Sequence, residues 1–338
     1  MSLRALLLGL VIVSEVSGIS RKAFPETCTT QSQMNAQDRN SLAAAARDVA
    51  AKVQAADFSG IRSETVAEFA SNFGAMQNLV QQTGPHLAGG ALTLDQLYLL
   101  DASQLKVAGD AQFFCSLNQS AAEVGFMIPG LTPGVYGFAV VQVASSTPWV
   151  VPMLLRKDQG RWLLAGFYPR PTQAAGHDGL WYWREARRLA AAKQRWNAWL
   201  YYGEAEMLLT PVNFIQSTHL DKLRDEQRAT TPPALSGGIS REVPLTIKGH
   251  DGTVYQFTSL GTDDTLSKDQ IDVSAHLRVD QVGDPISARK RNEDAMRALV
   301  AAYPELRDSF HGVWMISEGA ATPGQAPFAT EQAMTDLH

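Results

Sequence analysis

The sequence lacks the short motifs that usually mark a catalytic or metal centre. Its seven histidines form no HxxxH or HExxH spacing, and its two cysteines form no CxxC pair. It has no GxSxG segment and no glycine-rich loop that follows a strand and opens a helix. We therefore expect no metal and no cofactor, and no residue is predicted to be catalytic.

An excess of basic charge and long apolar runs are also missing. The chain of 338 residues has 29 Lys and Arg against 34 Asp and Glu, a net charge of -5, so no cationic surface for phosphate backbones is expected. No apolar run reaches the roughly 20 residues that span a bilayer. Nucleic acid is therefore not an expected partner, and no transmembrane segment is predicted.

The first residues have the order of a secretory signal. Arg4 precedes an apolar run at 5–13, and small residues follow at 16–18. We predict a signal peptide at 1–18, followed by an N-terminal segment at 19–36, and hence export to the periplasm or the extracellular space. The alternative is a buried N-terminal helix, because Glu15 is unusual within a signal.

The two cysteines, Cys28 and Cys115, fit an oxidising compartment, where a disulfide between them would persist. Such a bond would close a long loop and stabilise the fold by several kcal/mol, on the order of 4 kcal/mol. Lipidation of Cys28 is the alternative, although the residues before it, Phe-Pro-Glu-Thr, differ from those that precede lipidated cysteines.

The composition is that of a globular protein with more than one core. Hydrophobic residues make up 45% of the chain and charged residues 19%. Because single cores stop growing at roughly 250 to 300 residues, a chain of this length is expected to divide into at least two domains. We predict an α+β fold: helices packed on a curved antiparallel sheet, a helical connector, and a small β-β-β-α-β domain.

The first predicted domain, 37–170, begins with apolar residues at helical spacing to about residue 56 and again over 63–82. The Gly84-Pro85 pair is expected to end the second helix. Runs of β-branched and aromatic residues separated by turn residues then predict six strands. These are 92–100, 112–117, 123–128, 135–143, 149–156 and 161–168. Residues 135–143 are apolar on both faces, which predicts a strand covered from both sides.

This order of elements, closed by the long hairpin 149–168, resembles the NTF2-like superfamily of cone-shaped α+β domains. The resemblance implies a curved sheet whose aromatic side chains line the interior of the cone, with Phe114, Tyr136, Trp149 and Trp162 as candidate ligand-binding residues. A densely filled interior is the alternative to a ligand cavity. Members of this superfamily include enzymes, ligand binders and interaction modules, so the fold alone selects no function.

The region 178–229 keeps helical spacing of its apolar residues and is predicted to be a helical connector, with its last helix over 212–228. Residues 179–212 resemble a single tetratricopeptide helix pair in the spacing of Tyr182, Ala186, Leu189, Ala198, Tyr202 and Ala205. The Pro- and Gly-rich tract 230–238 is predicted to be a linker.

The last predicted domain, 239–318, contains two strands joined at 249–252 and a third strand over 271–279. His276 and Arg278 are expected on the solvated face of that third strand. Asp284-Pro285 is expected to cap and begin a helix, and 310–317 to add a fourth strand. Residues 319–338 are predicted to be irregular.

Two functions remain open at this point. The first is a non-catalytic exported protein that binds a protein partner or a small apolar ligand. The second is a small hydrolase or isomerase that uses the cone of the first domain, where burial could raise the pKa of a carboxyl group into a useful range.

Overall fold

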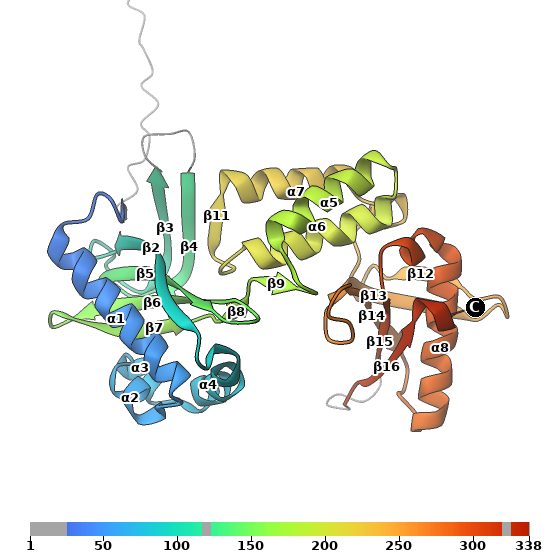
Figure 1. Cartoon of the computed structure of the whole chain (residues 1–338), viewed down its shortest axis with the longest axis horizontal. Coiled ribbons are helices and arrows are strands. Elements are labelled where there is room, and N and C mark those ends of the chain that lie inside the picture. Colours follow the sequence, from blue (N-terminus) through green and yellow to red (C-terminus); the bar gives the residue numbers. More distant parts are fainter. Residues whose placement is uncertain (1–25, 117–122, 320–325, 338) are drawn as a thin grey trace, which may run out of the picture.

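The computed structural model describes residues 26–116, 123–319 and 326–337. The predicted signal peptide and most of the N-terminal segment lie outside these residues. Figure 1 shows the first domain at one end, the last sheet at the other, and a group of helices between them. The predicted α+β class is confirmed.

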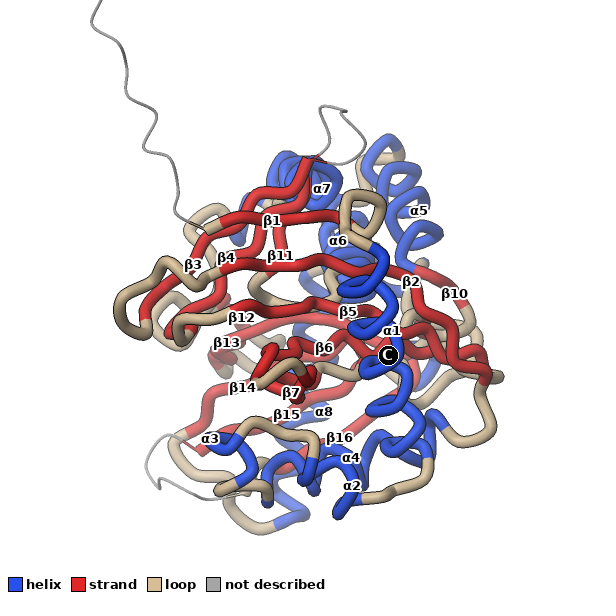
Figure 2. Tube along the Cα trace, turned by 90° about the vertical axis from the view of Figure 1, so that its left-hand side faces the viewer, coloured by secondary structure: helices blue, strands red, loops and turns tan. Residues whose placement is uncertain are grey.

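The first domain begins with four helices, α1 (Ala36–Gln54), α2 (Phe58–Ser63), α3 (Ala67–Ala70) and α4 (Gly74–Leu87). The continuous helix expected over 63–82 is wrong. The chain at Thr65 and Val66 is extended instead, because it pairs with strand residue Leu164, whose carbonyl accepts the Val66 N–H at 3.0 Å. Helix α4 also continues past Gly84 and through Pro85. Figures 1 and 2 show α1 crossing the sheet, with α2 and α4 near one end of it.

All six predicted strands of this domain are present, and they form two antiparallel sheets rather than one. The first sheet has the order β1-β2-β5-β6-β7, with β8 also paired to β6, and the second has the order β11-β4-β3. The strands are β1 (Thr27–Thr30), β2 (Ala91–Asp101), β3 (Gly109–Ser116), β4 (Glu123–Leu131), β5 (Val135–Ala144), β6 (Trp149–Asp158), β7 (Arg161–Phe167), β8 (Arg170–Pro171) and β11 (Ile215–Ser217).

Strand β5 is covered on both faces, as predicted. Its residues Ala139 and Val141 belong to the core shared with the helices. Its residues Tyr136 and Phe138 belong to a second core, shared with the β11-β4-β3 sheet. The alternation of a strand sends successive side chains to opposite faces. One strand therefore contributes to two separate cores.

The connector contains β9 (Gln173–Ala174), β10 (His177–Asp178), α5 (Gly179–Ala191), α6 (Arg195–Leu209) and α7 (Thr218–Thr230). Asp178 caps α5, since its side chain accepts the N–H of Trp181 at 2.7 Å. The helix expected from residue 212 is wrong in its start, because Ile215–Ser217 forms β11 and pairs with β4. This pairing attaches the connector to the first domain.

The last sheet has the order β12-β13-β14-β15-β16. Its elements are β12 (Leu245–Lys248), β13 (Val254–Asp263), β14 (Asp272–Val279), α8 (Pro285–Ala302), β15 (Gly312–Gly319) and β16 (Phe328–Ala333). The cap at Asp284 and the strand expected at 310–317 are confirmed. The irregular tail is wrong, because β16 pairs with β15 and the buried Asn292 donates to Thr330 Oγ1 at 3.2 Å.

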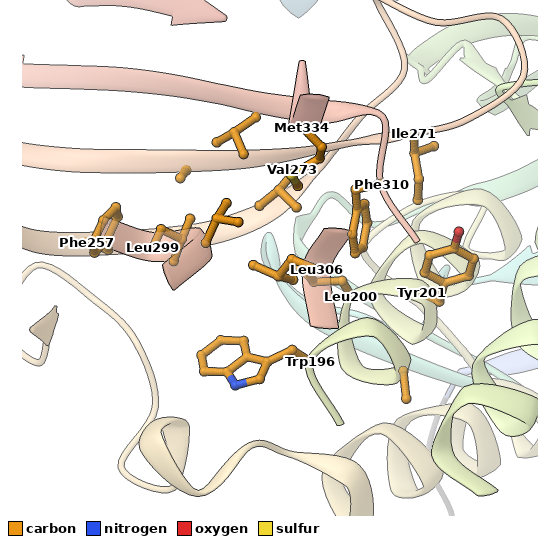
Figure 3. Packing of buried hydrophobic residues seen from close by; sticks show 14 of the residues in the cluster. Trp196, Leu200, Tyr201, Phe257, Ile271, Val273, Leu299, Leu306, Phe310 and Met334 are labelled. Atoms are coloured by element: carbon orange, nitrogen blue, oxygen red, sulfur yellow. The ribbon is translucent and has the colours of Figure 1, made fainter. Parts of the chain in front are cut away.

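The tract 230–238, predicted as a linker, is packed against the protein. It contains a short 3-10 helix, η1 (Pro233–Leu235), and Leu235 is buried in one core with the connector helices and the last sheet. Figure 3 shows part of that core, in which Trp196 from α6 lies near Leu299 and Leu306. The connector and the last sheet therefore share a hydrophobic core.

Candidate binding site

The four candidate aromatic residues of the first domain do not converge on one cavity. Tyr136 is buried in the core beneath the second sheet, whereas Trp149 and Trp162 belong to the core on the helix side. Phe114 lies on the outer face of the β3-β4 hairpin and is half exposed, so its expected interior position is wrong. Its neighbour Cys115 takes the inward position, because alternate residues of a strand point to opposite faces.

The interior of the first domain is filled by side chains that already have partners. The Trp162 indole donates to Ser41 Oγ at 3.0 Å, and the Trp149 ring stacks on His86 with centroids 4.8 Å apart. The buried polar residues among 26–116 and 123–170 are three threonines, and none is an acid. This arrangement offers no carboxyl group in the interior for acid–base chemistry.

One edge of the first sheet is only partly covered. Strand β1 pairs with β2 over Tyr98–Asp101 and then stops, because the Thr30 carbonyl accepts the N–H groups of Gln33 and Met34 and turns the chain away. Within the described parts of the chain, the residues of β2 from Ala91 to Leu97 pair with β5 alone. Their outer edge carries backbone groups that no neighbouring strand satisfies.

A β-bulge interrupts this exposed edge. The register between β2 and β5 shifts between Leu94 and Gln96, which leaves Asp95 as the extra residue. Bulges bend a strand and redirect a side chain, and they are frequent next to functional sites. Asp95 and Gln96 are both exposed to solvent.

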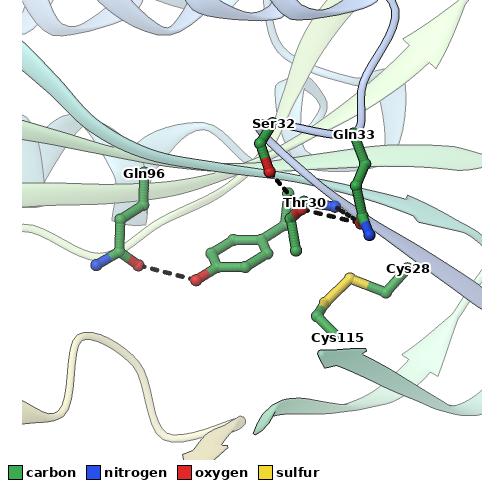
Figure 4. The surroundings of a disulfide bond; sticks show 7 residues. Cys28, Thr30, Ser32, Gln33, Gln96 and Cys115 are labelled. Carbon is green, nitrogen blue, oxygen red and sulfur yellow. Dashed lines mark hydrogen bonds between the residues drawn. A yellow bond between two sulfur atoms is a disulfide. The ribbon is translucent and has the colours of Figure 1, made fainter. Parts of the chain in front are cut away.

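A hollow of about 640 Å³ lies where β1 leaves the edge of β2. We call it the edge hollow. Its lining residues come from the end of β1 and the turn after it, from α1 and from β2: Thr30, Gln31, Ser32, Arg39, Asp95, Gln96, Leu97 and Tyr98. Figure 4 shows this turn beside the Cys28–Cys115 disulfide. The disulfide ties β1 to β3 and thereby fixes one wall of the edge hollow.

A smaller hollow of about 240 Å³, the apolar hollow, shares Asp95 and Gln96 with the edge hollow. It lies between the first sheet and the connector, and most of its lining is apolar. Its apolar side chains are Val140, Val150, Leu180, Leu208, Leu209 and Pro211. Leu180 is 54% exposed. The two hollows together border the free edge of β2, and the apolar hollow also borders α5 and α6 of the connector.

The Tyr98 hydroxyl and the Asp95 carboxylate are ionisable groups next to Gln96, a residue that lines both hollows. The Tyr98 hydroxyl donates to Gln96 Oε1 at 3.2 Å (Figure 4). Burial raises the pKa of Tyr98, and the Asp95 carboxylate raises it further, so this phenol is neutral at physiological pH and acts as a donor. Asp95 is left as an exposed negative charge at the bulge.

Other polar clusters contribute no side chain to the lining of the two hollows. Glu204 on α6 is 1% exposed and accepts the Thr262 hydroxyl, and burial raises its pKa to about 7. The buried Asp272 accepts a hydrogen bond from His311 Nδ1 at 3.0 Å. Neither pair borders one of the hollows described above. Among the described residues, no group of three or more His, Cys, Asp or Glu side chains could hold a metal ion.

The solvated face predicted for the third strand of the last domain carries a local ion-pair network. His276 Nδ1 and Glu318 Oε1 are 2.8 Å apart, and Glu318 also pairs with Arg241. The hydrogen bond from His276 is the main cause that lowers the pKa of Glu318. These charges largely neutralise one another, which is typical of a solvated sheet face.

Sequence patterns did not indicate the β2 edge. A β-bulge has no sequence motif of its own, and the length of β1 depends on a turn whose hydrogen bonds are not visible in the sequence. The one available signal is the charged Asp95, followed by the polar Gln96, within a strand that is mostly apolar. Such a charge on a strand is typical of an edge.

Comparison with known proteins identifies no relative. No family model, no curated protein and no solved structure matches the chain. None of the described helices is long and apolar enough to cross a membrane. The features of the molecule that bear on function are therefore the two hollows and the strand edge between them.

Proposed function

We propose that this chain is a non-catalytic exported protein that binds a protein partner along the free edge of β2. The observation that carries the proposal is the unpaired stretch Ala91–Leu97 beside the edge hollow. Exposed strand edges are normally covered, shortened or protected by charge, and an edge beside a hollow is a common peptide-binding surface.

Three further observations support a binding role. The first-domain interior is packed and has no buried acid among its described residues, which favours binding over acid–base catalysis. The Cys28–Cys115 disulfide supports export, because disulfides persist in oxidising compartments and are rare in the cytosol. Because the sulfur of Cys28 is bonded to Cys115, it is not available for a thioether to lipid.

We also infer that residues 37–170 are NTF2-like and that 179–212 are a single tetratricopeptide-like helix pair. Helices on one face of an antiparallel sheet support the first inference, and the contact between α5 and α6 supports the second. In this proposal, the helix pair closes one side of the binding site, because Leu180 and Leu208 line the apolar hollow.

Site-specific photo-crosslinking tests the proposal without disturbing the fold. A photoreactive amino acid is placed at Asp95, at Gln96 and, as a control, at Ile286, which is 83% exposed on α8. Irradiation of cells that export the full chain should give one protein adduct shared by positions 95 and 96 and missing at 286. Equal adducts at all three positions, or none at 95 and 96, would show that the edge of β2 has no specific partner.

A further inference from the structure

We propose that the partner contributes an extended segment that pairs as an additional strand with β2, places one aliphatic side chain in the apolar hollow, and presents a basic residue to Asp95. This inference rests on the proposed binding function and specifies its ligand. It combines the unpaired backbone of β2, the apolar hollow behind it and the charge at the bulge.

The backbone of β2 sets the conformation of the bound segment. The stretch Ala91–Leu97 has seven residues, which span about 23 Å at the rise of a β-strand. Strand β1 already occupies the neighbouring part of the same edge, opposite Tyr98–Asp101. A bound strand would therefore continue the row that β1 begins and would fill the edge hollow beyond Thr30.

The apolar hollow selects a side chain. In an added strand, alternate side chains point to the same face of the sheet. Gln96 and Val140 are paired across β2 and β5, and both line the apolar hollow, so this face of the edge opens toward it. An aliphatic side chain on that face would cover the exposed Leu180 and remove apolar surface from water.

The charge at the bulge selects a basic residue. Asp95 borders both hollows and is exposed, and Asp178 lines the apolar hollow. Among the described residues that line the two hollows, Arg39 is the one basic residue, and it borders the edge hollow but not the apolar hollow. A lysine or arginine beside the aliphatic anchor would therefore meet a carboxylate, whereas an acidic residue would be repelled.

The same charge disfavours a second copy of this chain as the occupant. The stretch Ala91–Leu97 has one charged residue, Asp95, and no basic residue. Two copies that paired antiparallel along this edge would bring their Asp95 carboxylates close together, with no cation between them. Like charges across a strand pair are destabilising. A foreign segment with a basic residue fits the edge better.

Synthetic seven-residue peptides test the inference on the oxidised full chain. The probe is an extended peptide with one leucine and one lysine, and matched peptides carry glutamate in place of lysine or N-methyl groups on alternate residues. Fluorescence anisotropy should show binding of the lysine peptide and at least tenfold weaker binding of the glutamate peptide. N-methylation of one alternate set should abolish binding, while the other set should leave it nearly unchanged.

Three variants distinguish the parts of the site. Leu180→Asp should weaken binding of the lysine peptide at least tenfold, and Asp95→Lys should reverse the preference toward the glutamate peptide. Ile286→Asp, an exposed apolar position on α8, is the matched control and should bind as the wild type does.

Specific outcomes would overturn the inference. Tolerance of both N-methylated sets would exclude strand pairing, and an unchanged charge preference in Asp95→Lys would exclude the carboxylate contact. A wild-type dimer that the peptide merely dissociates would make a second copy the occupant. If crosslinking from positions 95 and 96 still identified a partner, these results would reject the strand mode and leave the binding function standing. If no lysine peptide binds and no adduct forms, the bulge only protects the edge.

Discussion

Removal of the Cys28–Cys115 disulfide should strongly destabilise the first domain. The bond joins residues 87 positions apart with Cα atoms separated by 5.3 Å. In the chain-entropy model, a closed loop of this length removes about 15 cal/mol/K from the unfolded state, or about 4.6 kcal/mol at 25 °C. For a domain of this size, the loss corresponds to a decrease in Tm on the order of 10 to 15 °C.

The structure indicates where the effect should appear. Cys115 is buried in the core beneath the second sheet, and Cys28 lies in the short strand β1. Without the bond, β1 pairs with β2 through only four residue pairs. The last sheet lies in a different core, so its unfolding transition should change least. The connector also contributes Ile215 and Leu220 to the core around Cys115 and should be affected more.

Differential scanning calorimetry of the oxidised chain, the reduced chain and the Cys28→Ala/Cys115→Ala variant measures this effect. Reduction alone separates loss of the crosslink from loss of the two side chains. An unchanged first-domain transition after complete reduction would show that the disulfide does not stabilise this domain. Two alkylatable thiols in unreduced protein purified from an oxidising compartment would show that the bond does not form.

Three further changes have defined outcomes. Burial raises the pKa of Glu204 to about 7, so the folded state binds more protons than the unfolded state between about pH 4.5 and 7. The free energy of unfolding should therefore fall by about 3 kcal/mol as the pH rises through this window. Urea titrations of Glu204→Gln should lack that decrease. Gly137→Ala should cost about 1 to 3 kcal/mol in denaturant unfolding, because a Cβ there would overlap the buried Leu42 side chain, and Leu42→Ala should recover part of the loss in a double-mutant cycle. The side-chain amide of Asn292 donates to the Met315 carbonyl in β15 and to the Phe328 carbonyl and Thr330 Oγ1 in β16. Asn292→Leu should therefore lower the free energy of unfolding by about 2 kcal/mol and speed amide exchange in β16. Unaltered exchange in β16 would contradict this role.

Much of the fold could be predicted from local sequence patterns. The strands of the first domain, the cap at Asp284 and the two covered faces of β5 follow from periodicity and turn residues, which act over a few positions. The break near Thr65 could not be predicted in this way, because the helical pattern is overridden by pairing with Leu164, about a hundred residues away. The same holds for β11, whose partner β4 lies in the first domain.

The candidate site was less predictable than the fold. Aromatic residues of the first domain were expected to converge, but a strand sends alternate residues to opposite cores, and the sheet here has a core on each side. The edge of β2 depends on where β1 stops and on the bulge at Asp95. Both features arise from pairing between distant segments, so a single sequence carries little information about them.

Amide hydrogen exchange across β2 measures whether a partner binds at the free edge of this strand. The full chain is compared alone and with the partner that crosslinking from position 96 identifies. We expect the segment 91–97 to exchange more slowly in the complex, while the strands of the last sheet, β12 to β16, keep their rates. Unchanged exchange at 91–97 together with new protection confined to the last sheet would contradict this expectation, because the partner would then bind elsewhere.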